Sequence, residues 1–316
     1  MRAGLLVNPR SGGGSGKGLA LAQKLASSSV PAKILGHFDE LPQCLAEFAN
    51  GGVTDLFISS GDGTIHAVQT ELAENKLFAA LPRLALLPHG TTNMTAADLG
   101  FRRRGIDEQA EFIRNPLPTD FSERPTLRAV NPGDGRPRHG MFLGTGALSE
   151  AALLCQRTFN ARGVKGNWAT FATLASAVSR SLFSPSDPLD QTRFDRPFAI
   201  AVEVDGQPVA TGEHLLMLAT TLNKLILGAK PFWGGKKAAI RATILPYPVP
   251  ALPRWLLPIL YGGETVQAPP GAISFSAGEL AVRTPASFVL DGEFFHSAPD
   301  EALRIETGPV FTYVRG

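Results

Sequence analysis

The chain has 316 residues, of which 44% are hydrophobic and 18% charged, and its formal net charge is only +2. This composition excludes a disordered or fibrous protein, and the length favours two domains that each bury a core. The small net charge does not indicate a nucleic-acid partner, so none is expected. The basic clusters Arg102–Arg104 and Lys236–Lys237 can attract anionic lipid or phosphate, although solvated surface charge is the commoner meaning of such runs.

The first residues of the chain and its two cysteines indicate in which cellular compartment the protein is expected. Residues 1–8 run directly into an apolar strand pattern, without the longer apolar core and cleavage site of a signal peptide. Cys44 and Cys155 lie in apolar helical patterns, which disfavours a disulfide framework or a zinc site. No run reaches the roughly 18 apolar residues of a spanning helix. We therefore expect a cytoplasmic protein that meets a membrane only peripherally.

The first third of the chain alternates short apolar runs with helical patterns. Such alternation is typical of a parallel sheet, in which ligands bind beyond the carboxyl ends of the strands. Three turns follow strands and are expected to meet at that edge, namely Asn8–Gly18, Ser60–Thr64 and Pro88–Asn93. The apolar runs and helical patterns are Gly4–Val7, Leu19–Ala26, Ala32–Leu35, Leu41–Ala49, Asp55–Ser59, Ile65–Leu72 and Leu84–Leu87.

The first turn, Asn8–Gly18, is dense in glycine and can wrap closely around a phosphate. It is not a Walker A loop, because Ser11 stands where that motif has glycine and Gly18 follows Lys17. A dinucleotide fingerprint also fails, because no acidic residue follows Leu35 at the end of the second strand. Taken alone, the loop is equally compatible with a mobile turn.

The second turn carries the most information in the chain. An apolar strand ends in Gly61-Asp62-Gly63-Thr64, and a helical pattern begins at once. Gly61 and Gly63 have no Cβ, so backbone N–H groups can approach an anion at which the helix also directs its positive end. Asp62 then places a carboxylate where Mg²⁺ or a reacting hydroxyl would lie.

Two further motifs leave alternatives open. The turn Pro88–Asn93 offers a glycine and hydroxyl groups that suit phosphate oxygens, but helix capping by Thr91 or Thr92 explains it equally well. Near the other end of the chain, Asp291 and Glu293 close an apolar strand two residues apart. This spacing suggests an acid pair on one side of the strand end, able to hold a metal or take a proton. A hairpin turn with solvated acids is the alternative.

From about Leu127 the pattern changes to short alternating runs, which indicate antiparallel strands. A helical pattern over Glu150–Phe183 interrupts them and either lines a lipid groove or covers the sheet as an amphipathic helix. The Pro-rich segment Pro246–Pro258 predicts a loop or short spacer. The alternating runs are Thr126–Asn131, His139–Thr145, Phe198–Asp205, His214–Thr220, Lys237–Leu245, Ala272–Phe275, Leu280–Thr284 and Ser287–Leu290.

The order of four motifs closely resembles that of the diacylglycerol kinase catalytic-domain family, whose relatives include bacterial lipid kinases, sphingosine and ceramide kinases and, more distantly, NAD kinases. The resemblance covers nearly the whole chain. It implies an α/β protein with an N-terminal Rossmann-like nucleotide domain, a C-terminal antiparallel β-sandwich, and ATP bound in the cleft between them. The motifs are Asn8-Pro9-x-Ser11-Gly12, Ser60-Gly61-Asp62-Gly63-Thr64, Pro88-x-Gly90-Thr91-x-Asn93 and Asp291-Gly292-Glu293.

By the same resemblance, residues 1–125 form the nucleotide-binding domain and residues 126–300 the lipid-binding domain, and residues 301–316 return to the first. The implied activity is ATP- and Mg²⁺-dependent phosphorylation of a free hydroxyl of a neutral membrane lipid. Glu293 ranks slightly above Asp291 as the catalytic base, Asp62 is the third candidate, and Asp62 also lies near the metal. The implied nucleotide-binding residues are Asn8, Pro9, Arg10, Ser11, Gly12, Ser60, Gly61, Asp62, Gly63, Thr64, His66, Gly90, Thr91 and Asn93.

The chain departs from the family pattern at three places. His66-Ala67 replaces the usual Asn-Glu, and Met94 replaces an Asp, a change also found in sphingoid and ceramide kinases, which favours ceramide faintly over diacylglycerol. Lys236-Lys237 replaces the acidic stretch that binds a structural Mg²⁺ in some bacterial relatives, so no second metal site is expected. Trp255–Tyr261 and the Glu150–Phe183 helix are candidates for the lipid entrance.

The sequence leaves two other functions open. One is a degenerate kinase that binds nucleotide or lipid and regulates a partner, and the other, less favoured, is an NAD kinase. The acceptor lipid and the oligomeric state, including a homodimer, are not determined by the sequence. A lipid kinase of this kind would associate peripherally with the inner face of the membrane.

Overall fold

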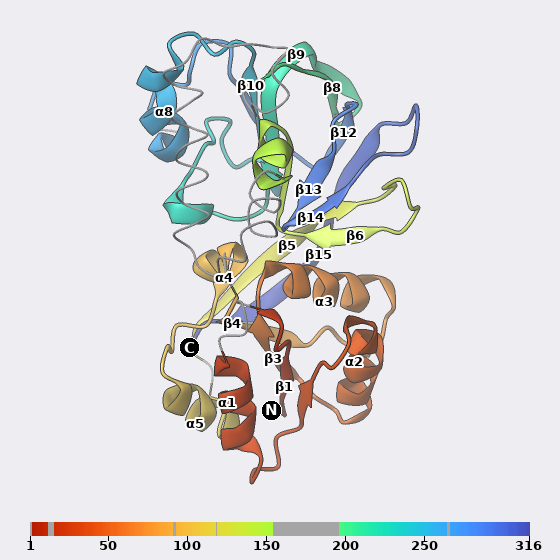
Figure 1. Ribbon diagram of the computed structural model, residues 1–316, viewed down its shortest axis with the longest axis vertical. Helices are drawn as coiled ribbons and strands as arrows, with labels where there is room; N and C mark the ends of the chain where they lie inside the picture. Colours follow the sequence, from red (N-terminus) through yellow and green to blue (C-terminus); the bar gives the residue numbers. More distant parts are fainter. Residues whose placement is uncertain (1, 12–15, 91–92, 118, 154–195, 264–265) are drawn as a thin grey trace. The chain divides into compact units, whose positions relative to one another are not determined.

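The computed structural model describes residues 2–11, 16–90, 93–117, 119–153, 196–263 and 266–316 (Figure 1). The chain divides into two compact units, the first comprising Met1–Thr126 with Gly308–Gly316 and the second Leu127–Thr307. Cys155 and most of the helix expected over Glu150–Phe183 lie outside the described residues, although residues 147–153 are helical. None of the described helices is long and apolar enough to cross a bilayer.

The first unit is built on a parallel sheet, as the sequence predicted. Its order is β2–β1–β3–β4, and the end of β15 continues it through a parallel pairing of Tyr313 with Leu84. Val7 lies opposite Ser59 and Ser60 opposite Pro88, so the carboxyl ends of β1, β3 and β4 meet at one edge. The strands are β1 (Ala3–Val7), β2 (Ala32–Ile34), β3 (Asp55–Ser60), β4 (Arg83–Pro88) and β15 (Leu303–Val314).

Helices cover both faces of this sheet (Figure 1). On one face, Leu21 of α1 and Ile113 of α5 share a buried core with Leu5 and Phe57 of the strands. The opposite face receives α2 and α3, and Phe48 of α2 packs directly over the sheet. The helices of this unit are α1 (Lys17–Leu25), η2 (Phe38–Glu40), α2 (Leu41–Asn50), α3 (Asp62–Glu74), α4 (Met94–Leu99) and α5 (Ile106–Arg114).

The described residues of the second unit form mainly antiparallel strands, together with the helix α8 (Leu252–Tyr261) and a helical stretch at residues 147–153. Its elements are β5 (Phe121–Ala129), β6 (Arg138–Gly140), β7 (Phe142–Gly146), β8 (Phe198–Val204), β9 (Gln207–Thr220), η3 (Ile226–Gly228), β10 (Ile240–Pro246), α8 (Leu252–Tyr261), β11 (Ile273–Ala277), β12 (Glu279–Arg283), β13 (Phe288–Leu290) and β14 (Glu293–Phe295). Both β5 and β15 begin in one unit and end in the other.

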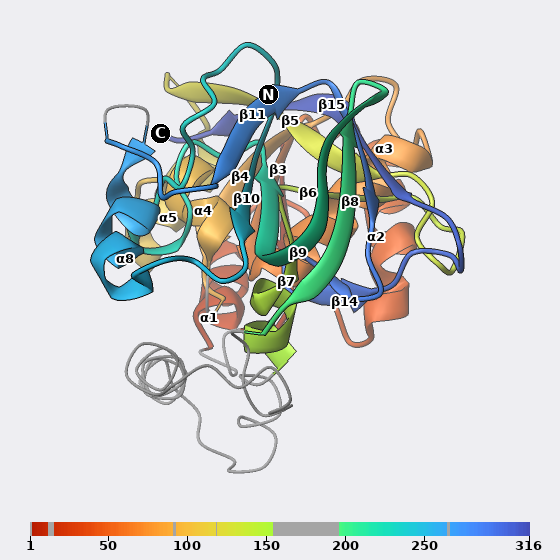
Figure 2. The same ribbon diagram turned by 90° about the horizontal axis from the view of Figure 1, so that it is seen from above.

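The long strand β9 belongs to two layers of antiparallel strands (Figure 2). Its first half pairs with β8, which continues to β12 and β15, whereas its second half pairs with β7 and β10. The change occurs near Gly212, whose φ of +123° favours glycine, and His214 already pairs with Pro246 of β10. Buried side chains of both layers, among them Val202 and Met217, form one core. This is the expected sandwich.

The Pro-rich segment differs from the expected loop, because Leu252–Tyr261 form the helix α8. Pro253 lies in the first turn, where its missing N–H would have no partner within the helix in any case. Pro258 lies inside the helix, and Gly262 N–H donates to its carbonyl at 2.8 Å. The apolar side chains of this segment pack at helical spacing against the sandwich, and tertiary packing therefore outweighs the low helix propensity of proline.

Candidate active site

In the first unit, Asn8 joins the first and second turns. Its side-chain Nδ2 donates to Oγ1 of Thr64 at 2.8 Å, and its backbone N–H donates to the carbonyl of Ser59 at 3.2 Å. Its Oδ1 accepts the backbone N–H of Arg10 at 3.0 Å, and its carbonyl accepts that of Ser11 at 3.2 Å. One asparagine thus fixes the start of the Gly-rich loop against the first turn of α3.

The second and third turns touch at their glycines. A Cβ on Gly90 would lie 2.2 Å from Cα of Gly61, so no other residue fits there without moving backbone. Asn93 closes the third turn, because its Oδ1 accepts the N–H of Gly90 at 2.8 Å and its Nδ2 donates to the Gly90 carbonyl at 2.6 Å. Asn93 has a φ of +50°, a left-handed conformation that asparagine tolerates well.

Asp62 holds the N-terminus of α4 with its carboxylate. Oδ2 accepts the backbone N–H of Met94 at 2.9 Å, and Oδ1 accepts that of Thr95 at 3.0 Å. Burial raises the pKa of Asp62, and these backbone donors oppose the shift because they favour the charged form. Asp62 is therefore a structural link between the second turn and α4.

A buried pair of side chains lies at the same edge, and the sequence did not point to it. Oγ of Ser59 and Nδ1 of His89 are 2.8 Å apart. Burial lowers the pKa of His89 to about 4, and the positive charge of Lys17 adds to this effect, so His89 is neutral at pH 7. A Cβ on Gly18 would lie 2.3 Å from Oγ of Ser59, so glycine at this position lets α1 approach β3 closely. The available signal was position at a strand end, because Ser59 directly precedes the second turn and His89 is the second residue of the third turn.

We expect the free energy of unfolding to decline as the pH falls from about 6.5 to about 4, partly through His89. The pKa of His89 is near 6.5 in the unfolded chain and about 4 in the folded one, so the unfolded chain binds the proton first. After allowance for solvent screening, we expect His89→Asn to remove about 1–2 kcal/mol of this decline. Urea unfolding at pH 7 and pH 5 measures it, with the exposed His37→Asn as control. An unchanged decline would contradict the assignment.

The other predicted nucleotide-binding residues differ in exposure. Arg10 is exposed, and Pro9 and Ser11 are partly exposed, whereas Ser60 and His66 are buried, with 0% and 5% of their surfaces accessible. Gly12 and Thr91 lie outside the described residues. The exposed part of the edge thus offers backbone and small residues, whereas Ser60 and His66 are buried.

In the second unit, Asp291 and Gly292 form the two-residue turn between β13 and β14. Their φ values are +47° and +96°, as expected for an Asp-Gly hairpin turn. Oδ2 of Asp291 accepts the N–H of Met141 at 2.8 Å, and Oδ1 accepts that of Phe142 at 3.0 Å. The run predicted as one strand over His139–Thr145 is accordingly two strands, β6 and β7, divided at Met141.

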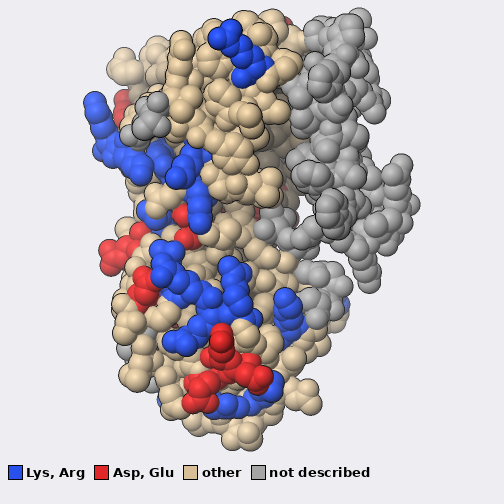
Figure 3. Space-filling model, turned by 90° about the vertical axis from the view of Figure 1, so that its left-hand side faces the viewer, with Lys and Arg blue, Asp and Glu red and all other residues tan. Residues whose placement is uncertain are grey.

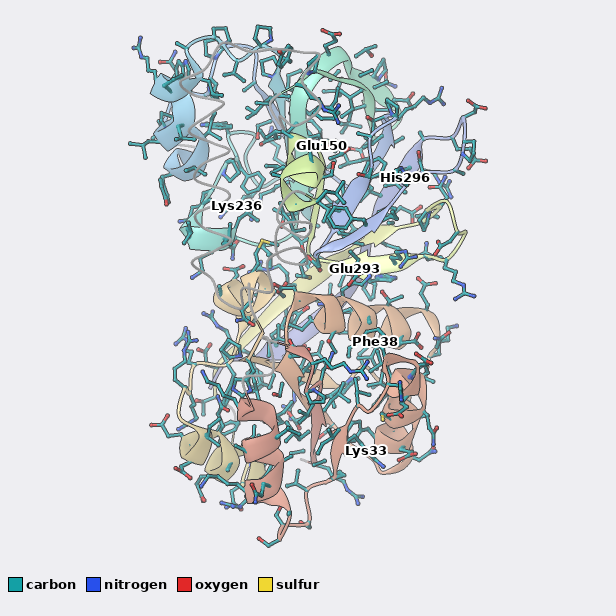
Figure 4. The ribbon with its side chains drawn as sticks, in the orientation of Figure 1. Lys33, Phe38, Glu150, Lys236, Glu293 and His296 are labelled. Carbon is teal, nitrogen blue, oxygen red and sulfur yellow. The ribbon has the colours of Figure 1, made fainter. Side chains whose placement is uncertain are left out.

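Asp291 and Glu293 do not form the acid pair that the spacing suggested. Asp291 is only 4% exposed, whereas Glu293 is exposed at the start of β14 (Figure 4). The positive φ of the turn breaks the simple alternation of side chains, so the two carboxylates have different surroundings. Within the part of the chain that the structure describes, no hydrogen bond or ion pair engages the Glu293 side chain. The hairpin alternative is correct for the backbone and wrong for the solvation of Asp291.

Asp62 and Asp291 share one arrangement in their separate units. Each is buried, and each accepts two consecutive backbone N–H groups with its two oxygens. Both carboxylates are therefore engaged in holding backbone, whereas no described residue hydrogen-bonds to the side chain of Glu293. No cluster of three or more His, Cys, Asp or Glu suited to a metal occurs among the described residues.

Comparison with known proteins bears on this geometry. Residues 2–122 match the family model of the diacylglycerol kinase catalytic domain. The first unit therefore carries a diacylglycerol kinase catalytic domain. The match contains the three turns of the first unit, and Asp291 and Glu293 lie beyond it. No curated protein sequence matches the chain.

Solved structures resemble the chain over its full length. A crystal structure named "putative diacylglycerol kinase" from Bacillus anthracis str. Sterne has a TM-score of 0.65 at 18% identity, covering 100% of this chain and 97% of that one. Another, of a diacylglycerol kinase from the same organism, has a TM-score of 0.62 at 18% identity with the same coverage. An NAD kinase from Archaeoglobus fulgidus in complex with ATP reaches 0.48 at 12% identity, covering 98% and 92%. At these identities the likeness to the Bacillus proteins shows the fold.

Proposed function

We propose that this protein, which carries a diacylglycerol kinase catalytic domain, transfers the γ-phosphate of ATP to a free hydroxyl of a neutral membrane lipid. The observation that carries the proposal is the edge of the first sheet, where three turns are locked together by Asn8, Asp62 and Asn93. The candidate acceptors are ceramide or another sphingoid lipid and diacylglycerol. We further propose that the enzyme is cytoplasmic and works at the inner face of the membrane.

The proposed nucleotide site uses backbone more than side chains. Gly61 and Gly90 are in contact at the edge of the sheet. Because glycine has no Cβ, neither residue blocks a phosphate that approaches this edge. The N-terminus of α3 begins at Asp62, and that of α1 follows Gly16, so both helices direct partial positive charge to this end of the sheet. The exposed Arg10 can add a full positive charge beside the phosphates.

The donor set is compatible with a nucleotide-bound Mg²⁺. In kinases this ion takes one or two protein carboxylates and completes its shell with phosphate oxygens and water. Asp62 would supply the carboxylate, while its hydrogen bonds with the N–H groups of Met94 and Thr95 hold it at this edge. When bound, the ion neutralises the charge of the phosphates.

Glu293 is the proposed catalytic base, ahead of Asp291 and Asp62. A base must accept a proton from the acceptor hydroxyl, which requires an accessible carboxylate with an unused lone pair. Glu293 meets both conditions, whereas Asp291 is buried and already accepts two N–H groups. Phosphoryl transfer otherwise depends on positioning and charge neutralisation, so a single base is sufficient.

Transfer of labelled γ-phosphate from ATP to lipids in mixed detergent micelles tests this function. The panel contains ceramide, sphingosine, diacylglycerol and, as a non-lipid acceptor, NAD. We expect product on one class of neutral lipid and none on NAD. Label on NAD alone would contradict lipid phosphorylation, and ATP binding without any product would instead favour the regulatory alternative raised by His66-Ala67.

A further inference from the structure

The helix α8 is packed on one side and bare on the other. Leu252 and Ile259 lie against a small buried cluster of the second unit. Arg254, Leu257 and Tyr261, spaced three and four residues apart, occupy a different face of the helix. Leu257 is 68% exposed and Tyr261 52% exposed, so large apolar surface on this face is open to solvent. No residue of α8 is fully buried.

A turn with two more exposed apolar side chains is fixed beside the end of α8. Leu227 is 75% exposed and Ile226 51% exposed. The turn closes through a 2.8 Å hydrogen bond from Leu225 N–H to the Ala229 carbonyl. The next residue, Lys230, donates its backbone N–H to the carbonyl of Leu260 at 2.7 Å. Its own carbonyl accepts the N–H of Gly263 at 3.1 Å. The exposed apolar residues of the turn and of the helix are thereby held near one another.

The segment that contains this surface, between Glu213 and Glu264, is basic. Residues 214–263 contain six Lys and Arg and not a single Asp or Glu, although the whole chain contains 28 acidic residues. Lys230, Lys236, Lys237 and Arg254 are exposed, and within the described residues none of them forms an ion pair. Figure 3 faces the side on which α8 lies in Figure 1, and on the described part of its upper half blue side chains are more prominent than red ones.

We propose that this surface docks on an anionic lipid bilayer. The α8 surface comprises Ile226, Leu227, Leu257 and Tyr261 as its apolar part and Lys230, Lys236, Lys237 and Arg254 as its basic part. Lys236 and Lys237 closely follow Trp233, whose Nε1 would lie 3.3 Å from a Cβ on Gly262 at the end of α8, and Figure 4 labels Lys236. Apolar side chains that enter the headgroup region, flanked by basic residues, are the features of interfacial binding. The partner is thus a membrane that carries negatively charged headgroups.

A second copy of the chain fits this surface less well. In a symmetric dimer the same face would meet itself and bring the basic residues of both copies together. Negatively charged lipid headgroups complement those residues without such repulsion. The inference deepens the proposed function, on which it rests for its biological purpose, by naming the surface through which the kinase would meet its substrate membrane.

Sedimentation with sucrose-loaded vesicles tests the inference without ATP or acceptor lipid. We expect the chain to bind phosphatidylcholine vesicles that contain about 30% phosphatidylglycerol and to bind pure phosphatidylcholine at least about tenfold more weakly. Leu257→Glu is expected to reduce binding to the anionic vesicles by about tenfold or more, because it removes apolar contact and adds repulsion. The double variant Lys236→Glu with Lys237→Glu is expected to do the same and to weaken the salt dependence.

Matched variants away from the α8 surface serve as controls. Leu117 is 78% exposed in the first unit, and Leu117→Glu should bind as the wild type does. Lys76→Glu with Arg136→Glu repeats the charge change at two other exposed sites. Equal binding to neutral vesicles, wild-type binding by both α8-surface variants, or equal loss in the controls would overturn the inference. The inference would also be overturned if the chain binds no vesicle and instead forms a concentration-dependent dimer that Leu257→Glu abolishes.

The readout separates this inference from the proposed function. Vesicle binding that depends on Leu257 and the lysines, in a chain that phosphorylates no lipid in micelles, would contradict the function and leave the docking surface supported. Lipid phosphorylation in micelles without vesicle binding would support the proposed function and contradict the docking surface. The substituted side chains are exposed, so thermal unfolding is expected to match that of the wild type in each variant.

Discussion

Glu293→Gln is expected to lower kcat for lipid phosphorylation by about 10²–10⁴-fold while leaving ATP affinity and thermal stability unchanged. Glutamine keeps the size of the side chain but cannot accept the proton of the acceptor hydroxyl. Glu293 is exposed, and no described residue hydrogen-bonds to its side chain, so the substitution should not disturb the fold. Initial rates in mixed micelles, with ATP binding measured by calorimetry and unfolding by circular dichroism, check all three quantities.

Two variants control for this prediction. Glu279→Gln makes the same change at an exposed glutamate of β12 and should leave kcat unchanged. Asp291→Asn should instead lower the unfolding free energy by about 1–3 kcal/mol, because an amide cannot accept the N–H groups of both Met141 and Phe142. If Glu293→Gln retains more than about a tenth of the rate, the base is a different group.

Gly90→Ala is expected to weaken ATP binding by about tenfold or more and to destabilise the first unit by about 1–3 kcal/mol. The added methyl group would lie 2.2 Å from Cα of Gly61, so one of the two turns has to move. Either movement strains the hydrogen bonds between Gly90 and Asn93, which are 2.6 and 2.8 Å long. Calorimetric titration with ATP and urea unfolding of the full chain measure the two effects.

Gly105→Ala is the matched control. Gly105 precedes α5 with a φ of −72°, which any residue adopts, and the nearest atom to its added Cβ would be 3.5 Å away. We expect wild-type ATP affinity and a change in stability within about 0.5 kcal/mol. Wild-type ATP affinity in Gly90→Ala would mean that the contact between Gly61 and Gly90 is not part of the nucleotide site.

The sequence was most informative about buried strands. Gly4–Val7 and Leu84–Leu87 lie in β1 and β4, whose interiors are continuous apolar runs with helical patterns beside them. Both faces of a parallel sheet are covered, so the sequence of each strand is a continuous apolar run, which differs clearly from the periodic pattern of an amphipathic helix. The turns at their carboxyl ends follow from this pattern, and they contain most of the candidate nucleotide residues.

Interactions across long stretches of sequence were beyond prediction. Asp291 accepts hydrogen bonds from residues 150 and 149 positions away, and no local pattern reports such a pairing. The attachment of Asp62 to α4 is likewise set by tertiary structure, and it gives Asp62 a structural task besides any role near a metal. The helix α8 was missed because proline weighs strongly against a helix in isolation, whereas packing decides in the folded chain.

The most direct test of lipid phosphorylation is one labelling experiment. The chain is incubated with ATP carrying an isotope-labelled γ-phosphate and with a total membrane lipid extract supplemented with ceramide and diacylglycerol, and the lipids are then identified by mass spectrometry. We predict that one class of neutral lipid gains a single labelled phosphate on a hydroxyl group and that Glu293→Gln forms none. An extract in which no lipid carries the label, from a chain that binds ATP, would contradict the proposed lipid kinase activity.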